Sequence, residues 1–175
     1  MGAIVLAGAQ NWSTSVFLFY VLITLSTTCA FASNGGTTLL VSFSGEVSVR
    51  NSSLTNWQKA EVGQVLPPGL TLKTQAVSHA NILFPDGTQI KLAEDSELLI
   101  KAPKPLAKKA VSSTDLLLAR GKLWGRAKSL PNQLSISTPT ATASIRGTEW
   151  EVDATKENSS SVMVLSGQVE LSNSI

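Results

Sequence analysis

The chain has 175 residues, which is enough for one domain and leaves little room for a second. Its 14 basic and 12 acidic residues give a formal net charge of +2, which excludes a dedicated nucleic-acid binder, so no nucleic-acid partner is expected. One histidine and one cysteine are too few for a metal centre of those ligands or for a disulfide.

The N-terminal segment contains an apolar run at residues 16–25, followed by Ala30-Phe31-Ala32. About ten apolar residues before an A-x-A site are typical of a secretory signal peptide, which would be cleaved after Ala32. No Lys or Arg precedes Arg50, which departs from the basic start of such signals, so an uncleaved membrane anchor and a buried helix are the alternatives. The run is short for a bilayer span, which takes about 20 apolar residues.

This pattern predicts a signal peptide or membrane anchor at residues 1–32, a linker at 33–39 and a β domain at 40–172. The protein is therefore expected to be exported to the periplasm or the extracellular space, possible contact with the membrane being limited to an uncleaved N-terminal segment. Cleavage after Ala32 would also remove Cys29 and leave a mature chain without any cysteine.

Short strand-forming segments follow one another from Leu39 onward, separated by Gly, Pro, Asn and Asp turn signals. Pro85-Asp86-Gly87 predicts a β-hairpin, because Gly supplies the positive φ of a tight turn. At most a helical turn is expected near residues 56–60. The predicted strands are 39–43, 46–50, 70–74, 80–84, 88–92, 97–100, 116–119, 122–125, 133–137, 148–153, 161–165 and 168–171. So many short strands predict a single all-β domain, either a twisted sandwich or solenoid-like.

A short motif of glycine, a polar residue and an aliphatic residue occurs three times after an apolar strand. Each glycine is expected in a bend or bulge, where a Cβ would clash, before the next strand restarts its alternation. The irregular spacing of the copies does not establish a true solenoid. The copies are Gly45-Glu46-Val47, Gly121-Lys122-Leu123 and Gly167-Gln168-Val169.

Residues 101–114 contain two prolines and four lysines, which predicts an exposed loop. Such a basic loop could contact an anionic surface. The favoured interpretation is that its lysines keep a strand-rich protein soluble and protect strand edges.

No catalytic constellation emerges from the sequence. His79 lacks a nucleophile elbow around any serine and is interpreted as a surface or strand-edge histidine. Glu149, Glu151 and Asp153 recur at every second residue, about 7 Å apart, as glycosidase carboxylates can be. Such a pair needs one acid in an apolar pocket, whereas these three share the predicted wet face, and calcium would need a denser acidic loop. The expectation is a non-enzymatic protein without a cofactor.

The stretch at residues 138–152, TPTATASIRGTEWEV, contains the candidate motif Arg146, Gly147, Thr148, Glu149 and Trp150. It predicts a turn at Arg146-Gly147 and then a strand with Thr148, Trp150 and Val152 on its buried face. Arg146 is interpreted either as a structural clamp that bonds a carbonyl or a carboxylate, or as a partner-recognition residue.

The order of motifs over roughly residues 40–172 resembles the FecR domain family. The resemblance rests on Ser44-Gly45-Glu46-Val47-Ser48-Val49, Trp57, Val62-Gly63, Leu66, residues 70–74, 80–88 and 118–123, Thr138-Pro139, and residues 145–152 and 164–169. It implies an all-β extracytoplasmic domain, which in the ferric-citrate type of regulator passes a receptor's signal across the inner membrane to a sigma factor.

Those regulators carry a cytoplasmic anti-sigma segment before a membrane helix, whereas only residues 1–15 precede the apolar run here. The resemblance therefore implies a stand-alone exported FecR domain. The expected function is a non-enzymatic binding or interaction module of the cell envelope, whose strand edges and loops contact another envelope protein. The alternative is a membrane-anchored signal-transducing regulator of the ferric-citrate sensor type. The sequence does not predict the oligomeric state.

Overall fold

The computed structural model describes residues 36–52, 55–102, 114–127, 134–156 and 159–173, all within the unit Gly35–Ile175. These residues form strands and connecting segments and contain no helix, which confirms the all-β prediction. Accordingly, this part of the chain has no helix of the length and apolarity needed to cross a membrane. The predicted signal peptide or anchor at 1–32 and most of the basic loop at 101–114 lie outside the described residues.

Eleven strands of the described chain form one sheet. Its order is β1-β5-β6-β8-β7-β4-β2-β3, and β10 adds to β8 together with β9 and β11. The strands are β1 (Leu39–Ser44), β2 (Val47–Asn51), β3 (Gln58–Lys59), β4 (Leu70–Thr74), β5 (His79–Leu83), β6 (Gln89–Leu92), β7 (Glu97–Ile100), β8 (Thr114–Arg126), β9 (Leu134–Ser137), β10 (Ala141–Lys156) and β11 (Ser159–Asn173).

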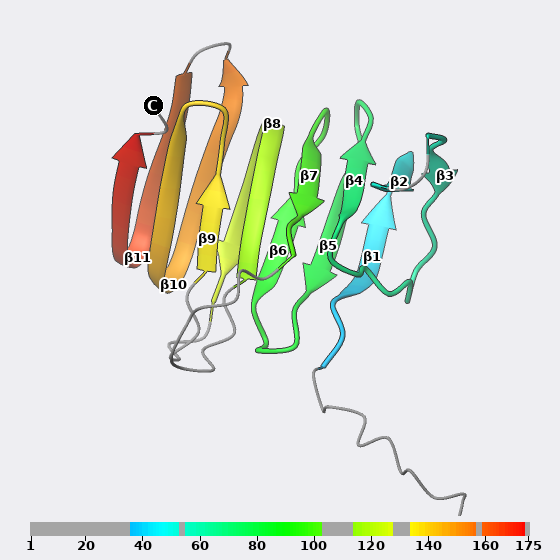
Figure 1. Cartoon of the computed structure of the whole chain (residues 1–175), viewed down its shortest axis with the longest axis horizontal. Helices are drawn as coiled ribbons and strands as arrows, with labels where there is room; N and C mark the ends of the chain where they lie inside the picture. The colour runs from blue at the N-terminus through cyan, green and yellow to red at the C-terminus, as the bar shows by residue number, and fades with distance from the viewer. Residues whose placement is uncertain (1–35, 53–54, 103–113, 128–133, 157–158, 174–175) are drawn as a thin grey trace, which may run out of the picture. The chain divides into compact units, whose positions relative to one another are not determined.

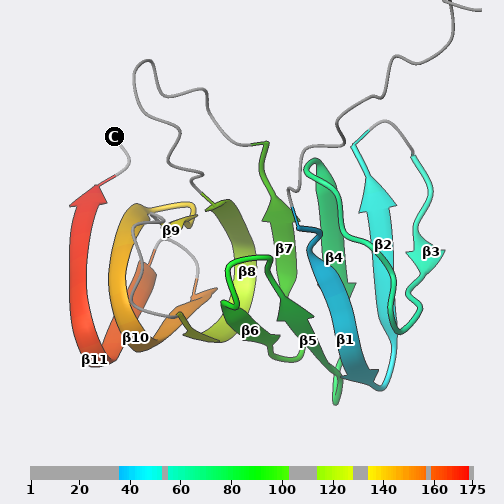
Figure 2. The same ribbon diagram turned by 90° about the horizontal axis from the view of Figure 1, so that it is seen from below.

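The sheet is folded into two layers that share their longest strands. The first half of β8 pairs with β7 and its second half pairs with β6, so β6 and β7 follow one another along the same side of β8. Figures 1 and 2 show β1, β5 and β6 in one layer and β2, β4 and β7 in the other, with β8, β10 and β11 curving from one layer into the next. Strands that bend between layers through bulges are a known way to form the corners of a sandwich.

The three glycine motifs lie at these corners. Gly45 connects β1 to β2 with φ +77°, Gly121 lies inside β8 with φ +94°, and Gly167 lies inside β11 with φ +107°. A side chain is disfavoured at such angles, whereas glycine adopts them readily. The register between β10 and β11 also shifts beside Gly167. These observations confirm the prediction that each motif marks a bend or bulge.

A serine from the neighbouring turn fills the space that each of two corner glycines leaves. The backbone N–H of Lys122 donates to Ser96 Oγ at 3.0 Å, and Ser96 Oγ donates to the carbonyl of Glu94 at 2.8 Å. A Cβ on Gly121 would overlap Ser96, including its backbone Cα. The same arrangement, at 2.9 Å and 3.0 Å, joins Glu46, Ser78, Ala76 and Gly45.

The core lies between the two layers and follows the alternation of the strands. Alternate residues of β4, β5, β7 and β8 are buried, including Leu72, Ile82, Leu98 and Leu123. Full burial of each such side chain contributes roughly 1.5–3 kcal/mol to folding. The core is therefore continuous across the strands that the two layers share.

Several predicted boundaries are wrong, and the corners explain why. The predicted pairs 116–119 with 122–125, and 161–165 with 168–171, are each one long strand, β8 and β11. The predicted turn at Arg146-Gly147 is absent, because β10 continues through both residues with a register shift between Arg146 and Glu149. The segment near residues 56–60 contains β3 in place of a helical turn. A bend in a strand does not interrupt its backbone hydrogen bonds when the neighbouring strands bend at the paired residues.

The predicted hairpin is confirmed. β5 and β6 pair antiparallel, from Ala80 opposite Leu92 to Leu83 opposite Gln89. In the connecting turn Gly87 has φ +82°, and the N–H of Thr88 donates to Asp86 Oδ1 at 2.9 Å. The glycine thus serves as the sequence predicts.

Candidate functional site

Trp150 is a core residue and takes no part in a surface site. It is fully buried, as the alternation predicts, and so is Val152 two residues later. Trp150 lies opposite Gly125 of β8, and a Cβ on Gly125 would overlap the indole ring. The Trp150 Nε1–H has no acceptor among the described residues.

The three carboxylates on the opposite face of β10 are paired with basic side chains of β8. Glu149 Oε1 lies 3.6 Å from Arg126 Nε, and Lys122 Nζ lies 3.1 Å from Glu151 Oε1 and 3.3 Å from Asp153 Oδ2. They are half-buried, so the predicted wet face is correct, but the sequence analysis did not find their basic partners.

The pKa shifts of Asp153 and Lys122 both favour the charged form of the side chain. The Thr155 hydroxyl and N–H, which donate to Asp153 Oδ1 at 2.6 and 2.9 Å, lower the pKa of Asp153, and Lys122 lowers it further. Hydrogen bonds from Lys122 to Glu151 and Asp153 raise the pKa of Lys122. A catalytic acid would need the opposite shift in one carboxylate, and no group of His, Cys, Asp and Glu among the described residues could hold a metal ion.

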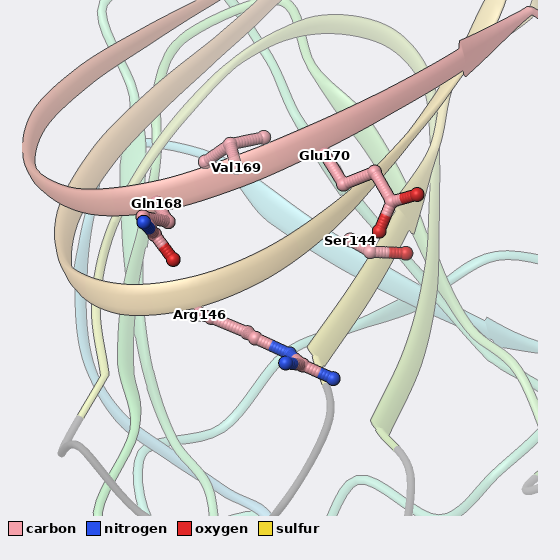
Figure 3. A pocket seen from close by; sticks show the side chains of 5 residues that line it. All are labelled: Ser144, Arg146, Gln168, Val169 and Glu170. Atoms are coloured by element: carbon pink, nitrogen blue, oxygen red, sulfur yellow. The ribbon is translucent and has the colours of Figure 1, made fainter.

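Arg146 is exposed and lines a shallow groove of about 420 Å³ with Ser144, Gln168, Val169 and Glu170. Ser144 lies opposite Glu170 and Arg146 opposite Gln168 across β10 and β11. In Figure 3 the Arg146 side chain extends from the curved ribbon of β10, clear of the other four. The groove therefore presents a cation and an anion on neighbouring strands.

Within the described part of the chain, no side-chain contact supports the interpretation of Arg146 as a structural clamp. Its guanidinium has no hydrogen bond or ion pair there, and the two nearby carboxylates, Glu149 and Glu151, are held by Arg126 and Lys122. The recognition interpretation stays a prediction. Gly147 and Thr148 belong to β10, but their side-chain environments, and any φ at Gly147, lie outside what the structure describes.

The edge strand β11 was not predicted from the sequence as a continuous edge of the sheet. β11 spans Ser159–Asn173 and pairs only with β10 among the described strands, and it ends the series of strands in Figure 1. Four of its apolar side chains are largely exposed: Met163 (59%), Val164 (41%), Leu165 (56%) and Leu171 (58%). Splitting β11 into two short strands hid this edge, although its scarcity of charge was visible in the sequence.

The exposed apolar residues occupy both faces of β11. Val164 lies opposite Trp150 and Leu171 opposite Ala143, so these two point toward the core side. Met163 lies opposite Glu151 and points to the outer face. The β11 edge therefore offers unpaired backbone groups together with apolar side chains on either face.

The opposite end of the sheet is covered, in contrast to the β11 edge. The N–H of Leu40 in β1 donates to the carbonyl of Gln64 at 3.0 Å, and the N–H of Gly63 donates to the carbonyl of Leu40 at 2.8 Å. The outer side of β2 pairs with β3, a short polar strand of two residues. Among the described edge strands, β3 has two residues, whereas β11 is long and has no such cover.

The remaining residues singled out from the sequence are His79 and the lysines of the basic loop. His79 begins β5, opposite Ser44 of β1, and is half-buried. Lys101 donates from Nζ to Ser137 Oγ at 3.2 Å. The other three lysines of the basic loop fall at residues 104, 108 and 109, outside the described part.

Comparison with known proteins supports the family that the motif order suggests. The family model described as FecR protein matches residues 70–170, more than half of the chain. No curated protein matches the sequence.

Two crystal structures of a candidate anti-sigma factor from Parabacteroides distasonis ATCC 8503 match part of the chain. One is 13% identical with a TM-score of 0.41, and the other is 12% identical with a TM-score of 0.39. The chain spans 59% of the length of each of these proteins, and 59% of the chain itself is covered. By the match of its strand-rich core to the family model, this chain belongs to the FecR protein family.

Proposed function

We propose that the protein is a non-enzymatic, extracytoplasmic binding module of the cell envelope that holds another envelope protein through the β11 edge. The observation that carries this proposal is a strand of 15 residues with one open side and four exposed apolar side chains. Family membership agrees with a regulatory or interaction role.

Natural sheets protect their edges with charges, prolines, bulges or covering segments. β11 contains one charged residue, Glu170, and no proline, whereas the opposite end of the sheet is covered by the Gln64 segment and β3. β11 bends at Gly167 and its register shifts there, but it has only one charge and no covering segment among the described residues, which leaves it open to pairing with another strand. The contrast between the two ends of the sheet supports strand pairing at the β11 edge rather than at the covered end.

The partner is expected to add an extended strand to β11. Strand addition takes its affinity from backbone hydrogen bonds and its specificity from alternate side chains. Apolar residues on the added strand would cover Val164 and Leu171 on the core side, and an acidic residue would meet the Arg146 guanidinium in the neighbouring groove. Arg146 would thereby contribute to the specificity for the partner.

A second candidate function is a membrane-anchored signal-transducing regulator of the ferric-citrate sensor type. The apolar run at residues 16–25 and the family favour it. Cell fractionation separates the two: a mature protein that begins at Ser33 in the soluble envelope fraction contradicts the anchored regulator. Full-length protein that stays with the inner membrane supports it.

The edge proposal is tested by placing a photo-crosslinking amino acid at Leu165 in the full-length protein in cells. The matched control is the same amino acid at Val62, an aliphatic position of comparable exposure (64%) away from β11. We expect a discrete adduct with one envelope protein from position 165 only. Binding of that purified partner should fall at least tenfold with Leu165→Lys and stay unchanged with Val62→Lys. Equal adducts from both positions, or none, would contradict the proposal.

A further inference from the structure

A second groove lies on the outer face of the sheet, in the layer formed by β1, β5, β6 and β8. It has a volume of about 380 Å³ and is separate from β11. Its lining side chains include Trp124, Asn81, Gln89, Lys91, Ser42 and Val41. None of the lining residues is acidic.

An aromatic ring forms part of this groove because β8 presents it outward. Trp124 lies one residue before Gly125 and is half-buried, whereas Leu123 on its other side is fully buried. Lys91 of β6 lies directly opposite Trp124, and Asn81 of β5 lies opposite Lys91. Directly opposed residues share a face with Cβ atoms about 4.5–5.5 Å apart, so these three side chains form one row across three strands.

The polar groups of the row have unused hydrogen-bonding capacity. Asn81 Nδ2 donates to Ser42 Oγ at 2.8 Å, which orients the amide and leaves its Oδ1 as an acceptor. The side chains of Gln89 and Lys91 are exposed and have no hydrogen bond or ion pair among the described residues. Glu151, which lies opposite Trp124 on the other side, is held by Lys122. Lys91 is thus the unneutralised charge of the groove.

We propose that this groove binds a pyranose saccharide that carries an acidic substituent. The indole ring offers an apolar surface for the C–H face of a sugar ring, and ligand sites typically combine such a surface with a few polar groups. The amides of Asn81 and Gln89 can bond neighbouring hydroxyl groups, since each amide both donates and accepts. The Lys91 ammonium meets the carboxylate of the sugar.

The test measures binding of purified protein to an array of oligosaccharides. The array holds oligomers of glucuronic, galacturonic and N-acetylmuramic acid together with neutral oligomers of glucose and N-acetylglucosamine. We expect at least one acidic oligomer to bind, and isothermal titration with it to show a loss of at least tenfold for Trp124→Ala. Trp124→Phe should keep part of the affinity, and Lys91→Met should remove the preference for acidic over neutral oligomers.

The matched control is Trp57→Ala. Trp57 is also a half-buried surface tryptophan, but it lies beneath Arg50, whose guanidinium carbon is 4.4 Å from the ring centre, and it does not line the groove. This variant should bind as the native protein does. Binding of no oligomer, or equal losses for Trp57→Ala and Trp124→Ala, would overturn the proposal. Leu165→Lys should leave saccharide binding unchanged, so this test is independent of the β11 edge.

Discussion

Replacement of Gly121 by alanine tests whether the corners hold the two layers together. Gly121 has φ +94°, and an added Cβ would overlap both the hydroxyl and the backbone of Ser96. Gly63 is the matched control, because its φ is +82° and an added Cβ there would meet nothing within 4 Å. The two variants therefore share the backbone strain and differ in the steric contact.

The expected magnitudes follow from these contacts. The positive φ costs a residue with a Cβ roughly 1–2 kcal/mol, and the reduced freedom of the unfolded chain offsets about 0.4–1 kcal/mol. Gly63→Ala should therefore lose about 1 kcal/mol. Gly121→Ala adds about 1–3 kcal/mol of overpacking and about 1 kcal/mol for weakening the Lys122 to Ser96 hydrogen bond. Its expected loss is about 3–5 kcal/mol.

Urea unfolding of both variants, followed by tryptophan fluorescence, measures these losses by linear extrapolation. The m-value of each variant should match that of the native protein, which shows that the comparison concerns the folded state. If the free energies of unfolding of the two variants differ by less than about 0.5 kcal/mol, the packing of Ser96 against Gly121 does not stabilise the corner, and the reasoning is refuted.

Three further predictions concern the core and the ion pairs. Gly125→Ala should destabilise the protein by about 2–3 kcal/mol, because the new Cβ displaces the Trp150 indole; an unchanged near-UV circular dichroism spectrum would contradict this. The folded pKa of Asp153 lies below its ordinary value of 3.8, so its stabilising contribution is present above that value and is lost as the pH falls through the folded pKa. Thr155→Val should therefore reduce the fall in stability in acid, and an identical acid profile would count against it. The pKa of Lys122 is raised above its ordinary value of 10.5, so its pH dependence is the reverse. Its contribution to stability is fully present below pH 10.5 and is lost as the pH rises through the folded pKa. Lys122→Met should flatten the alkaline profile, and an unaltered profile would be the contrary result.

The local sequence was sufficient to predict most strand segments and the buried face of β10, although not the continuity of the long strands. The alternation around Trp150 and Val152 predicted which side of β10 is buried, since burial on one face of a strand has a period of two. The glycine motifs predicted the corners, because glycine tolerates the positive φ that each of these bends adopts. These features depend on neighbours in the chain and could be inferred without knowing the fold.

The partners of the candidate residues depend on the register between strands, which local sequence patterns do not specify. Glu149 and Glu151 are held by Arg126 and Lys122 because β10 pairs with β8 at that alignment. A shift of one residue would turn every side chain to the other face. The same alignment leaves Arg146 without either of these carboxylates as a partner, whereas its choice between clamp and recognition stays a prediction. The continuity of β11 was missed because Gly167 interrupts the alternation without interrupting the ladder.

Amide hydrogen exchange of β11 with and without the partner captured at Leu165 tests the central claim most directly. A strand added to the β11 edge must take up the backbone N–H groups that point away from β10, and these alternate along the strand. We expect alternate amides of β11 on either side of the irregular segment around Gly167 to exchange at least tenfold more slowly in the complex, with β3 unchanged. Protection that spares β11, or that arises equally when the protein pairs with a second copy of itself, would contradict it.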